Sequence, residues 1–110
     1  MPQLSRSVHA AIHLAGVALA LIGIVMLPLA VAPWVCLASH GAGALTDRLE
    51  ATQERDTEFL GIVRVSLGIV ACLVSAGQHW VVGVTGPEYL ALAVLSLGLE
   101  MVRPAPETRG

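Results

Sequence analysis

The polar stretch TDRLEATQERDTE, residues 46–58, divides a chain that is strongly apolar on both sides of it. One apolar block covers residues 8–45, and a second covers residues 59–102. Among the 110 residues, 55% are hydrophobic and 13% are charged, whereas soluble domains carry about 25% charged residues. Since so few polar side chains cannot cover a soluble core, the composition predicts an integral membrane protein whose surface is covered by lipid.

Each apolar block is too long for one membrane-spanning helix. As a single helix the first block would measure about 57 Å, whereas the bilayer core is about 30 Å thick. Pro28 and Pro33 interrupt this block, and the turn sequence GVTGP at 83–87 interrupts the other. The sequence therefore predicts an all-α fold with four transmembrane helices, arranged as two hairpins in a single transmembrane domain over residues 1–110. The expected spans are residues 7–27, 30–46, 59–82 and 87–102, with a loop at 46–58 between the hairpins.

Charged and aromatic residues predict the orientation of the helices. All six basic residues are arginines, and in the two-hairpin arrangement they fall on, or just inside, the side that holds both termini and the loop. The positive-inside rule makes that side cytoplasmic. We therefore expect both termini in the cytoplasm and the protein in a bacterial cytoplasmic membrane. The aromatic rings that favour membrane interfaces mark the opposite side, at Trp34, Trp80 and Tyr89.

An arrangement with three spans is the alternative. In it, residues 29–45 lie on the membrane or dip into it without crossing. This arrangement places Arg6 on the side opposite the other five arginines and scatters the aromatic residues over both interfaces. Four spans therefore account better for the distribution of charge.

The loop at 46–58 contains two Arg and five acidic residues. Asp47 and Glu50 have the spacing of a capping box, which predicts the start of a short surface helix. We interpret the loop as a connector that its charges keep in water. The alternative is a docking surface for a soluble partner with basic groups.

Each expected helix carries small or polar residues at spacings of three or four, so that they share one face. Small residues let helices approach closely where lipid supplies no hydrophobic drive, and we interpret these faces as packing surfaces. Cys36 and Cys72 belong to them and are expected to be inert thiols. The members in chain order are His9, His13, Gly16, Ala20, Gly23; Pro33, Cys36, His40, Gly43, Asp47; Gly61, Arg64, Gly68, Cys72, Ser75, His79; and Ala93, Ser96, Glu100, Arg103.

Four ionisable residues of these faces form a candidate intramembrane polar cluster: His13, His40, Arg64 and Glu100. By the helical rise they lie at a similar depth, roughly 5–10 Å below the cytoplasmic edge. Ionisable groups within a bilayer are costly and usually face protein or water. Arg64 and Glu100 form a natural ion pair. Alternatively, Arg64 extends to the interface and Glu100 is hydrated.

His13 and His40 also suit the axial positions of a haem or pigment, since they lie at one depth on neighbouring helices. Helices rich in small residues leave little room for a macrocycle, so we expect no cofactor. A zinc site needs a tighter grouping of Cys and His, so no metal is expected either. The chain shows no catalytic motif and no basic tract, and its net charge is −2. We therefore expect neither an enzyme nor a protein that binds nucleic acid.

These features predict a non-catalytic protein that packs within the membrane, either as an accessory or structural subunit of a larger membrane complex or as a homo-oligomer. Its partners are then lipid and other membrane subunits or further copies of itself. Two other classes stay open: a compact oligomeric transporter or channel lined by the polar cluster, and a haem- or quinone-binding membrane anchor of a redox complex. In length and number of spans the chain is similar to the small multidrug transporters. It lacks the carboxylate that those proteins need in the middle of the first helix.

Reporter fusions at residues 30, 52, 85 and 110 test the expected topology. Because the loop and both termini are expected on the cytoplasmic side, the four-span arrangement predicts signals from outside, inside, outside and inside, in that order. A reversed signal at residue 30 alone would favour the arrangement with three spans.

Overall fold

The computed structural model of the protein describes residues 4–51 and 57–104. These residues form four α-helices, a π-helical turn and a 3₁₀ turn, and no β-strand. The prediction of an all-α fold with four main helices is confirmed. In chain order the elements are α1 (Arg6–Met26), α2 (Ala32–Ala51), α3 (Thr57–Gly77), η1 (Gln78–Val82), α4 (Glu88–Gly98) and η2 (Leu99–Val102).

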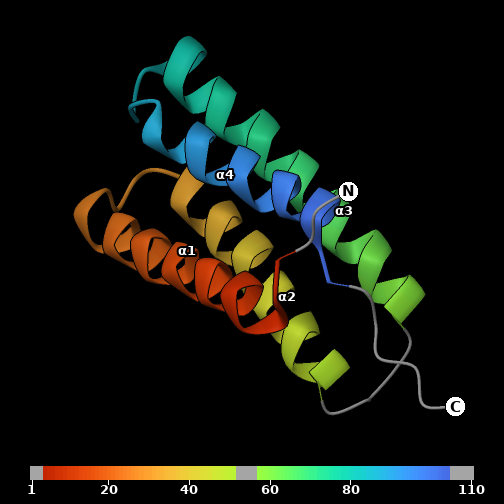
Figure 1. The fold of residues 1–110 in the computed structure, drawn as a ribbon. Coiled ribbons are helices and arrows are strands. Elements are labelled where there is room, and N and C mark those ends of the chain that lie inside the picture. Colours follow the sequence, from red (N-terminus) through yellow and green to blue (C-terminus); the bar gives the residue numbers. More distant parts are fainter. Residues whose placement is uncertain (1–3, 52–56, 105–110) are drawn as a thin grey trace, which may run out of the picture.

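One hairpin is formed by α1 and α2, and the other by α3 with η1 and α4 (Figure 1). The turns of both hairpins lie at one end of an elongated bundle, whose principal extents are 51, 24 and 21 Å. The start of α1, the end of α2, the start of α3 and η2 lie at the opposite end, which we name the terminal end. There the backbone N–H of Leu4 donates to the carbonyl of Val102 at 3.2 Å. Of the four helices, α2 makes the most extensive contacts with the others, and we therefore call it the central helix.

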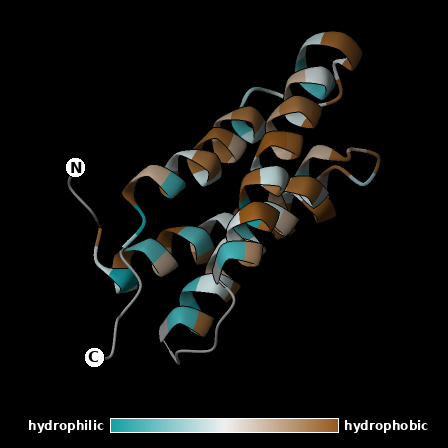
Figure 2. Cartoon of the chain, turned by 90° about the vertical axis from the view of Figure 1, so that its right-hand side faces the viewer, coloured by the Kyte–Doolittle hydropathy of each residue, from teal (hydrophilic) through white to brown (hydrophobic). Residues whose placement is uncertain are grey.

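The bundle has small residues inside and large apolar residues outside. The apolar residues with 0% exposure are Ala20, Ala32, Cys36, Ala71 and Ala93. Large side chains that are more than half exposed include Leu14, Ile22, Phe59, Ile62, Leu73 and Val94. Figure 2 shows hydrophobic residues along all the helices and hydrophilic residues mostly toward the terminal end. A surface of this kind requires an apolar cover.

Within residues 4–51 and 57–104, two helical segments are long and apolar enough to cross a membrane: α1 and Glu58–Val82. Core helices of soluble proteins can be equally long and apolar, but they are mostly buried. Only 28% of the apolar window in the first segment and 17% of that in the second are buried. The helix α2 has charged last turns and is not apolar enough to meet these criteria. The helix α4 has 11 residues and is too short. Length and composition therefore support two of the four expected spans.

The loop expected at 46–58 is shorter than predicted, because α2 continues to Ala51 and α3 begins at Thr57. Asp47 and Glu50 lie in the last turns of α2 and not at the start of a surface helix. They are 1% and 6% exposed, so the interpretation of this part as a solvated connector is wrong. The charges of these carboxylates are met by side chains of α1 and by Arg103, which follows η2. Residues 52–56 of the expected loop lie outside the described residues.

The aromatic residues near the hairpin turns differ in their surroundings. Trp34, at the start of α2, and Trp80, in η1, are both exposed, as expected for rings at an interface. Tyr89 is instead a core residue, and its ring packs against Gly23 of α1. A Cβ atom at Gly23 would overlap with the hydroxyl group of Tyr89, so the glycine makes room for the ring. The expectation of Tyr89 as an interfacial residue therefore does not describe its position.

The start of α2 is capped by a side chain from the other hairpin. Pro33 lies in the first turn of the helix, where its missing N–H removes no helical hydrogen bond. The N–H groups of Val31 and Ala32 both donate to Oε1 of Gln78, each at 2.8 Å. Gln78 is the first residue of η1. The second hairpin therefore holds the beginning of the central helix in the first.

Gln78→Ala is expected to destabilise the protein by about 1–2 kcal/mol, since two N–H groups at a helix start lose their acceptor. Gln78→Glu keeps an acceptor oxygen beside the helix N-terminus and should retain most of the stability. Unfolding of the purified variants in one detergent, followed by circular dichroism, measures the difference. Equal stability of the Ala and Glu variants would contradict the capping role of Gln78.

Candidate functional site

Asp47 lies at the centre of a buried polar network at the terminal end of the bundle. Its Oδ2 is 2.7 Å from Nδ1 of His9, and its Oδ1 accepts a hydrogen bond from Nη2 of Arg103 at 2.8 Å. The side chains of His9 and Asp47 are 0% and 1% exposed. Nε2 of His9 donates to the carbonyl of Leu99 at 3.0 Å. Through these contacts α1, α2 and the segment that follows α4 meet at one carboxylate.

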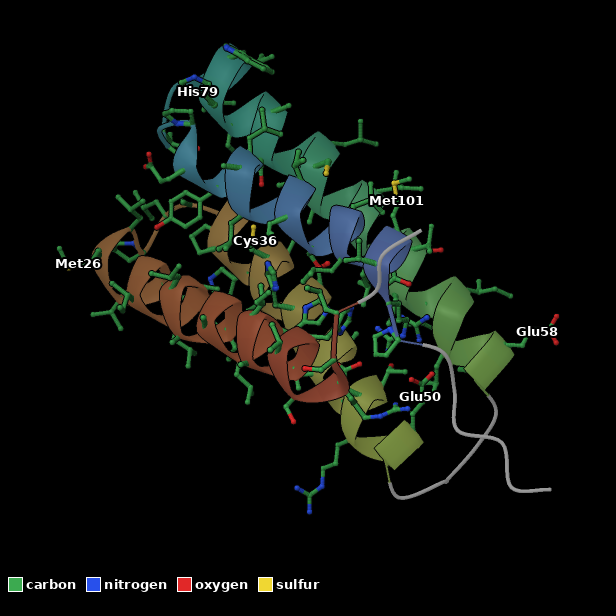
Figure 3. The ribbon with its side chains drawn as sticks, viewed as in Figure 1. Met26, Cys36, Glu50, Glu58, His79 and Met101 are labelled. Carbon is green, nitrogen blue, oxygen red and sulfur yellow. The ribbon has the colours of Figure 1, made fainter. Side chains whose placement is uncertain are left out.

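Glu50 extends this network along α2. Nη1 of Arg6 donates to Oε1 of Glu50 at 3.2 Å, and Nη2 of Arg103 lies 3.5 Å from the same oxygen. Figure 3 shows Glu50 lying against the bundle, whereas Glu58 at the start of α3 points away from it. Glu50 is therefore a member of the buried network, and Glu58 is a surface carboxylate.

Arg64 of α3 and Glu100 of η2 connect the second hairpin to the same network. Nε of Arg64 donates to both carboxylate oxygens of Glu100, at 3.1 and 3.0 Å. Nη1 of Arg103 lies 3.8 Å from Glu100. Among the residues that the structure describes, the network contains three arginines and three carboxylates, whose formal charges balance. This balance matters because an unpaired charge in a protein interior costs several kcal/mol.

His13 and His40 form a second pair, deeper in the bundle. Their Nδ1 atoms are 3.0 Å apart, and Nε2 of His40 donates to the carbonyl of Leu92 at 2.9 Å. Glycines make room for both rings: a Cβ atom at Gly16 would overlap with the ring of His40, and one at Gly43 with Nε2 of His13. Nε2 of His13 is buried and has no hydrogen-bond partner among the residues that the structure describes.

Hydroxyl and thiol groups continue the polar interior toward the hairpin turns. Oγ of Ser39 and Oγ of Ser96 are 2.7 Å apart, and Sγ of Cys36 lies 3.8 Å from Oγ of Ser75. Cys36 also donates to the carbonyl of Tyr89 at 3.4 Å. The network around Asp47, the pair of His13 and His40, and these hydroxyl and thiol groups together form a column of polar side chains that begins at the terminal end. We name it the polar column.

Burial lowers the pKa of the Arg103 guanidinium, and the nearby charge of Arg64 lowers it further. The carboxylates of Asp47, Glu50 and Glu100 act in the opposite direction and raise this pKa. Arg103 is therefore a dehydrated cation that carboxylates hold in place, and not a free surface charge.

The structure places the four residues of the predicted polar cluster in two pairs. His13 lies against His40, and Arg64 lies against Glu100. The members that connect the two pairs were missing from that cluster, although their sequence spacing put most of them on the same helix faces. These connecting residues are His9, Asp47, Glu50 and Arg103.

His9, His13 and Asp47 offer ligand atoms that all lie within 4.8 Å of one another, which is close enough to consider a metal ion. Their arrangement does not fit a divalent ion well. Both nitrogens of His9 already face oxygen atoms, and Asp47 is already paired with Arg103. Two further positive charges would also upset a network whose charges balance.

A haem held by His13 and His40 does not fit either. The two axial nitrogens of such a haem lie on opposite faces of the macrocycle. Nδ1 of His13 and Nδ1 of His40 are 3.0 Å apart, in direct contact, so no macrocycle lies between them. The rings also pack edge to face, with centroids 5.1 Å apart.

Comparison of the chain with protein families, curated proteins and solved structures finds no match. No residue role is therefore transferred from another protein. The chemistry of the site has to be inferred from the contacts of its own side chains.

Gly43→Ala should destabilise the protein by about 1–3 kcal/mol, because the added methyl group overlaps with His13 and forces the helices apart. Gly41→Ala is the matched control, since no atom lies within 4 Å of a Cβ atom at that position of the same helix. Because alanine favours a helix over glycine, Gly41→Ala should be neutral or stabilising by up to about 1 kcal/mol. Unfolding midpoints in one detergent compare the two variants, and equal midpoints would contradict the close packing at His13.

Proposed function

We propose that the protein crosses a bacterial cytoplasmic membrane four times, with both termini and the connection between the hairpins in the cytoplasm. The observation that carries this proposal is the direction in which the polar side chains of α2 point. Ser39, His40 and Asp47 are buried, whereas the exposed positions Trp34, Ala38 and Leu45 are apolar. The exposed Arg48 lies beyond the expected span at 30–46. The mean hydropathy of a helix also counts the face that lipid never contacts. A helix that buries its polar residues within the expected span is therefore compatible with a membrane.

The segment formed by α4 and η2 has the same property. After the exposed Glu88 in the first turn of α4, the exposed positions are apolar or small: Ala91, Val94, Leu95, Gly98 and Met101. Its helical turns together measure about 25 Å. That is a few ångströms less than a bilayer core, a mismatch that local thinning accommodates at modest cost. This segment therefore supports a fourth crossing.

Within the membrane, we propose a non-catalytic role as a subunit of a larger membrane complex or as a homo-oligomer. The small-residue faces expected to serve such packing are occupied inside the chain, as Gly16 and Gly23 illustrate. However, α1 carries a second small face that points outward, with Ala11, Ala15 and Ala18 all exposed at spacings of four and three. Such a face lets another membrane helix approach closely.

A compact transporter or channel is the second candidate, and the polar column favours it. Buried polar groups that line up through a helical bundle are a common feature of ion pathways. The polar groups of the column form hydrogen bonds mainly with one another. A role in packing is therefore the first candidate function. In liposomes, Arg64→Ala and Glu100→Ala change the flux of the transported ion if this second candidate holds.

Ala15→Phe tests the assembly role, because a large ring on the outward small face of α1 should block contact with another helix. We expect the full-length protein to form oligomers, or to co-purify with partner subunits, in a mild detergent. Ala15→Phe should shift it to the monomer, as measured by light scattering. Ala91→Phe, at an exposed alanine of α4, is the matched control and should leave assembly unchanged. A stable solitary monomer of the wild type, in detergent and after cross-linking in membranes, would contradict the proposal.

A further inference from the structure

Both nitrogens of His9 face oxygen atoms. Nε2 lies 3.0 Å from the carbonyl of Leu99, which only accepts hydrogen bonds, so this nitrogen carries a hydrogen. Nδ1 lies 2.7 Å from Oδ2 of Asp47. A neutral imidazole has a single N–H, so this second contact requires another proton, either on the ring or on the carboxyl group. His9 and Asp47 therefore hold one proton more than a neutral imidazole beside an ionised carboxylate.

The contacts of the deeper pair, His13 and His40, leave one ring nitrogen without a hydrogen. Nε2 of His40 lies 2.9 Å from the carbonyl of Leu92, so it carries the hydrogen of a neutral ring. The bare Nδ1 of His40 then accepts from Nδ1 of His13 at 3.0 Å. A neutral His13 is left with a bare Nε2, which is buried and unpartnered among the described residues. A buried acceptor without a donor is uncommon and needs an explanation.

The proton-rich pair and the bare nitrogen are neighbours. The ring centroids of His9 and His13 are 4.9 Å apart, and ligand atoms of His9, His13 and Asp47 all lie within 4.8 Å of one another. The Nε2 edge of His13 faces Gly43, which lies one helical turn before Asp47 on α2. The proton held by His9 and Asp47 and the bare nitrogen of His13 thus lie on neighbouring side chains.

We propose that His9, Asp47 and His13 form a buried proton-binding site, in which His9 and Asp47 hold one exchangeable proton and Nε2 of His13 is the vacant position. Transfer within the site breaks the N–H bond at Nδ1 of His9 as an O–H bond forms on Asp47. This O–H bond then breaks as an N–H bond forms at Nε2 of His13. The positive charge moves from one ring to the other, and no further reactant is needed. The site does not depend on how the protein assembles.

The surrounding charges favour a single proton over a divalent ion. Arg6, Arg64 and Arg103 balance three carboxylates, so one bound proton leaves a net charge of only one on the whole network. Arg103 donates to Oδ1 of Asp47, which stabilises the ionised carboxylate and places the resting proton on His9. His40 faces His13 from the other side and is neutral in this arrangement.

A hollow of about 390 Å³ between α1 and α2 gives the site a route to the surface. Its walls include Arg6, Asp47 and Arg48, so it lies at the terminal end. Asp47 is therefore both the link between the two rings and the member nearest to solvent. Protons exchange with the site from the terminal end of the bundle.

Nitrogen-15 NMR of the full chain, labelled at histidine and embedded in lipid bilayers, tests the proposal, because the shift of each ring nitrogen reports whether it carries a hydrogen. At neutral pH we expect His40 to be protonated at Nε2 and His13 at Nδ1. His9 should be protonated at both nitrogens, or at Nε2 beside a protonated Asp47 carboxyl group detected by its carbon-13 shift. On acidification, Nε2 of His13 should take up a proton before Nδ1 of His40 does.

Asp47→Asn removes the carboxylate that holds the extra proton and should leave His9 with a single N–H. Glu58→Gln changes an exposed carboxylate on α3 and should leave every histidine shift unchanged. If Asp47→Asn does not fold, the wild-type spectrum decides the question by itself. A His9 with one N–H beside an ionised Asp47 would overturn the proposal, and so would a His13 that carries its hydrogen on Nε2 at neutral pH.

Discussion

The rest of the structure depends on the contacts that Asp47 makes with His9 on one side and with Arg103 on the other. Removing one partner of a buried ion pair leaves an uncompensated charge, at a cost of about 3–5 kcal/mol. The start of α1 and the segment after α4 therefore stay packed against α2. The pair of Arg64 and Glu100 ties α3 to the same place. Charge thus holds the hairpins together at the terminal end, and backbone hydrogen bonds to the Gln78 side chain hold them at the other.

These ion pairs and histidine contacts are possible because the helices approach closely. Gly43 admits the ring of His13 and Gly16 admits that of His40, while large apolar side chains are turned outward. The interior therefore contains small and polar residues and the exterior mostly large apolar ones, the reverse of a soluble helical bundle. This reversal explains why α2 has a low mean hydropathy and yet presents apolar residues to its surroundings. It also buries the side chains of His9 and Asp47, on which we propose a single exchangeable proton.

The four helices could be predicted from the sequence, because apolar blocks and prolines are local signals. The end of α2 could not, since Asp47 meets partners that lie 38 positions before it and 56 positions after it. No local pattern contains such contacts, so the charges near residue 47 were interpreted as a sign of hydration. The structure also pairs Arg64 with Glu100, as equal depth and opposite charge suggested. The capping of α2 by Gln78 depends on the relative position of two hairpins and has no local signal either.

Spin-label accessibility along residues 34–50 of α2, measured in lipid bilayers, tests the central claim that this helix crosses the membrane with its polar face inward. Labels at the exposed positions Trp34, Ala38 and Leu45 should be accessible to oxygen dissolved in lipid. Labels at the buried positions Ser39 and Thr46 should be protected from oxygen and from a water-soluble nickel reagent, giving a period of about 3.6 residues. Access of the nickel reagent along one whole side of α2 would place the helix on the membrane surface and contradict the account.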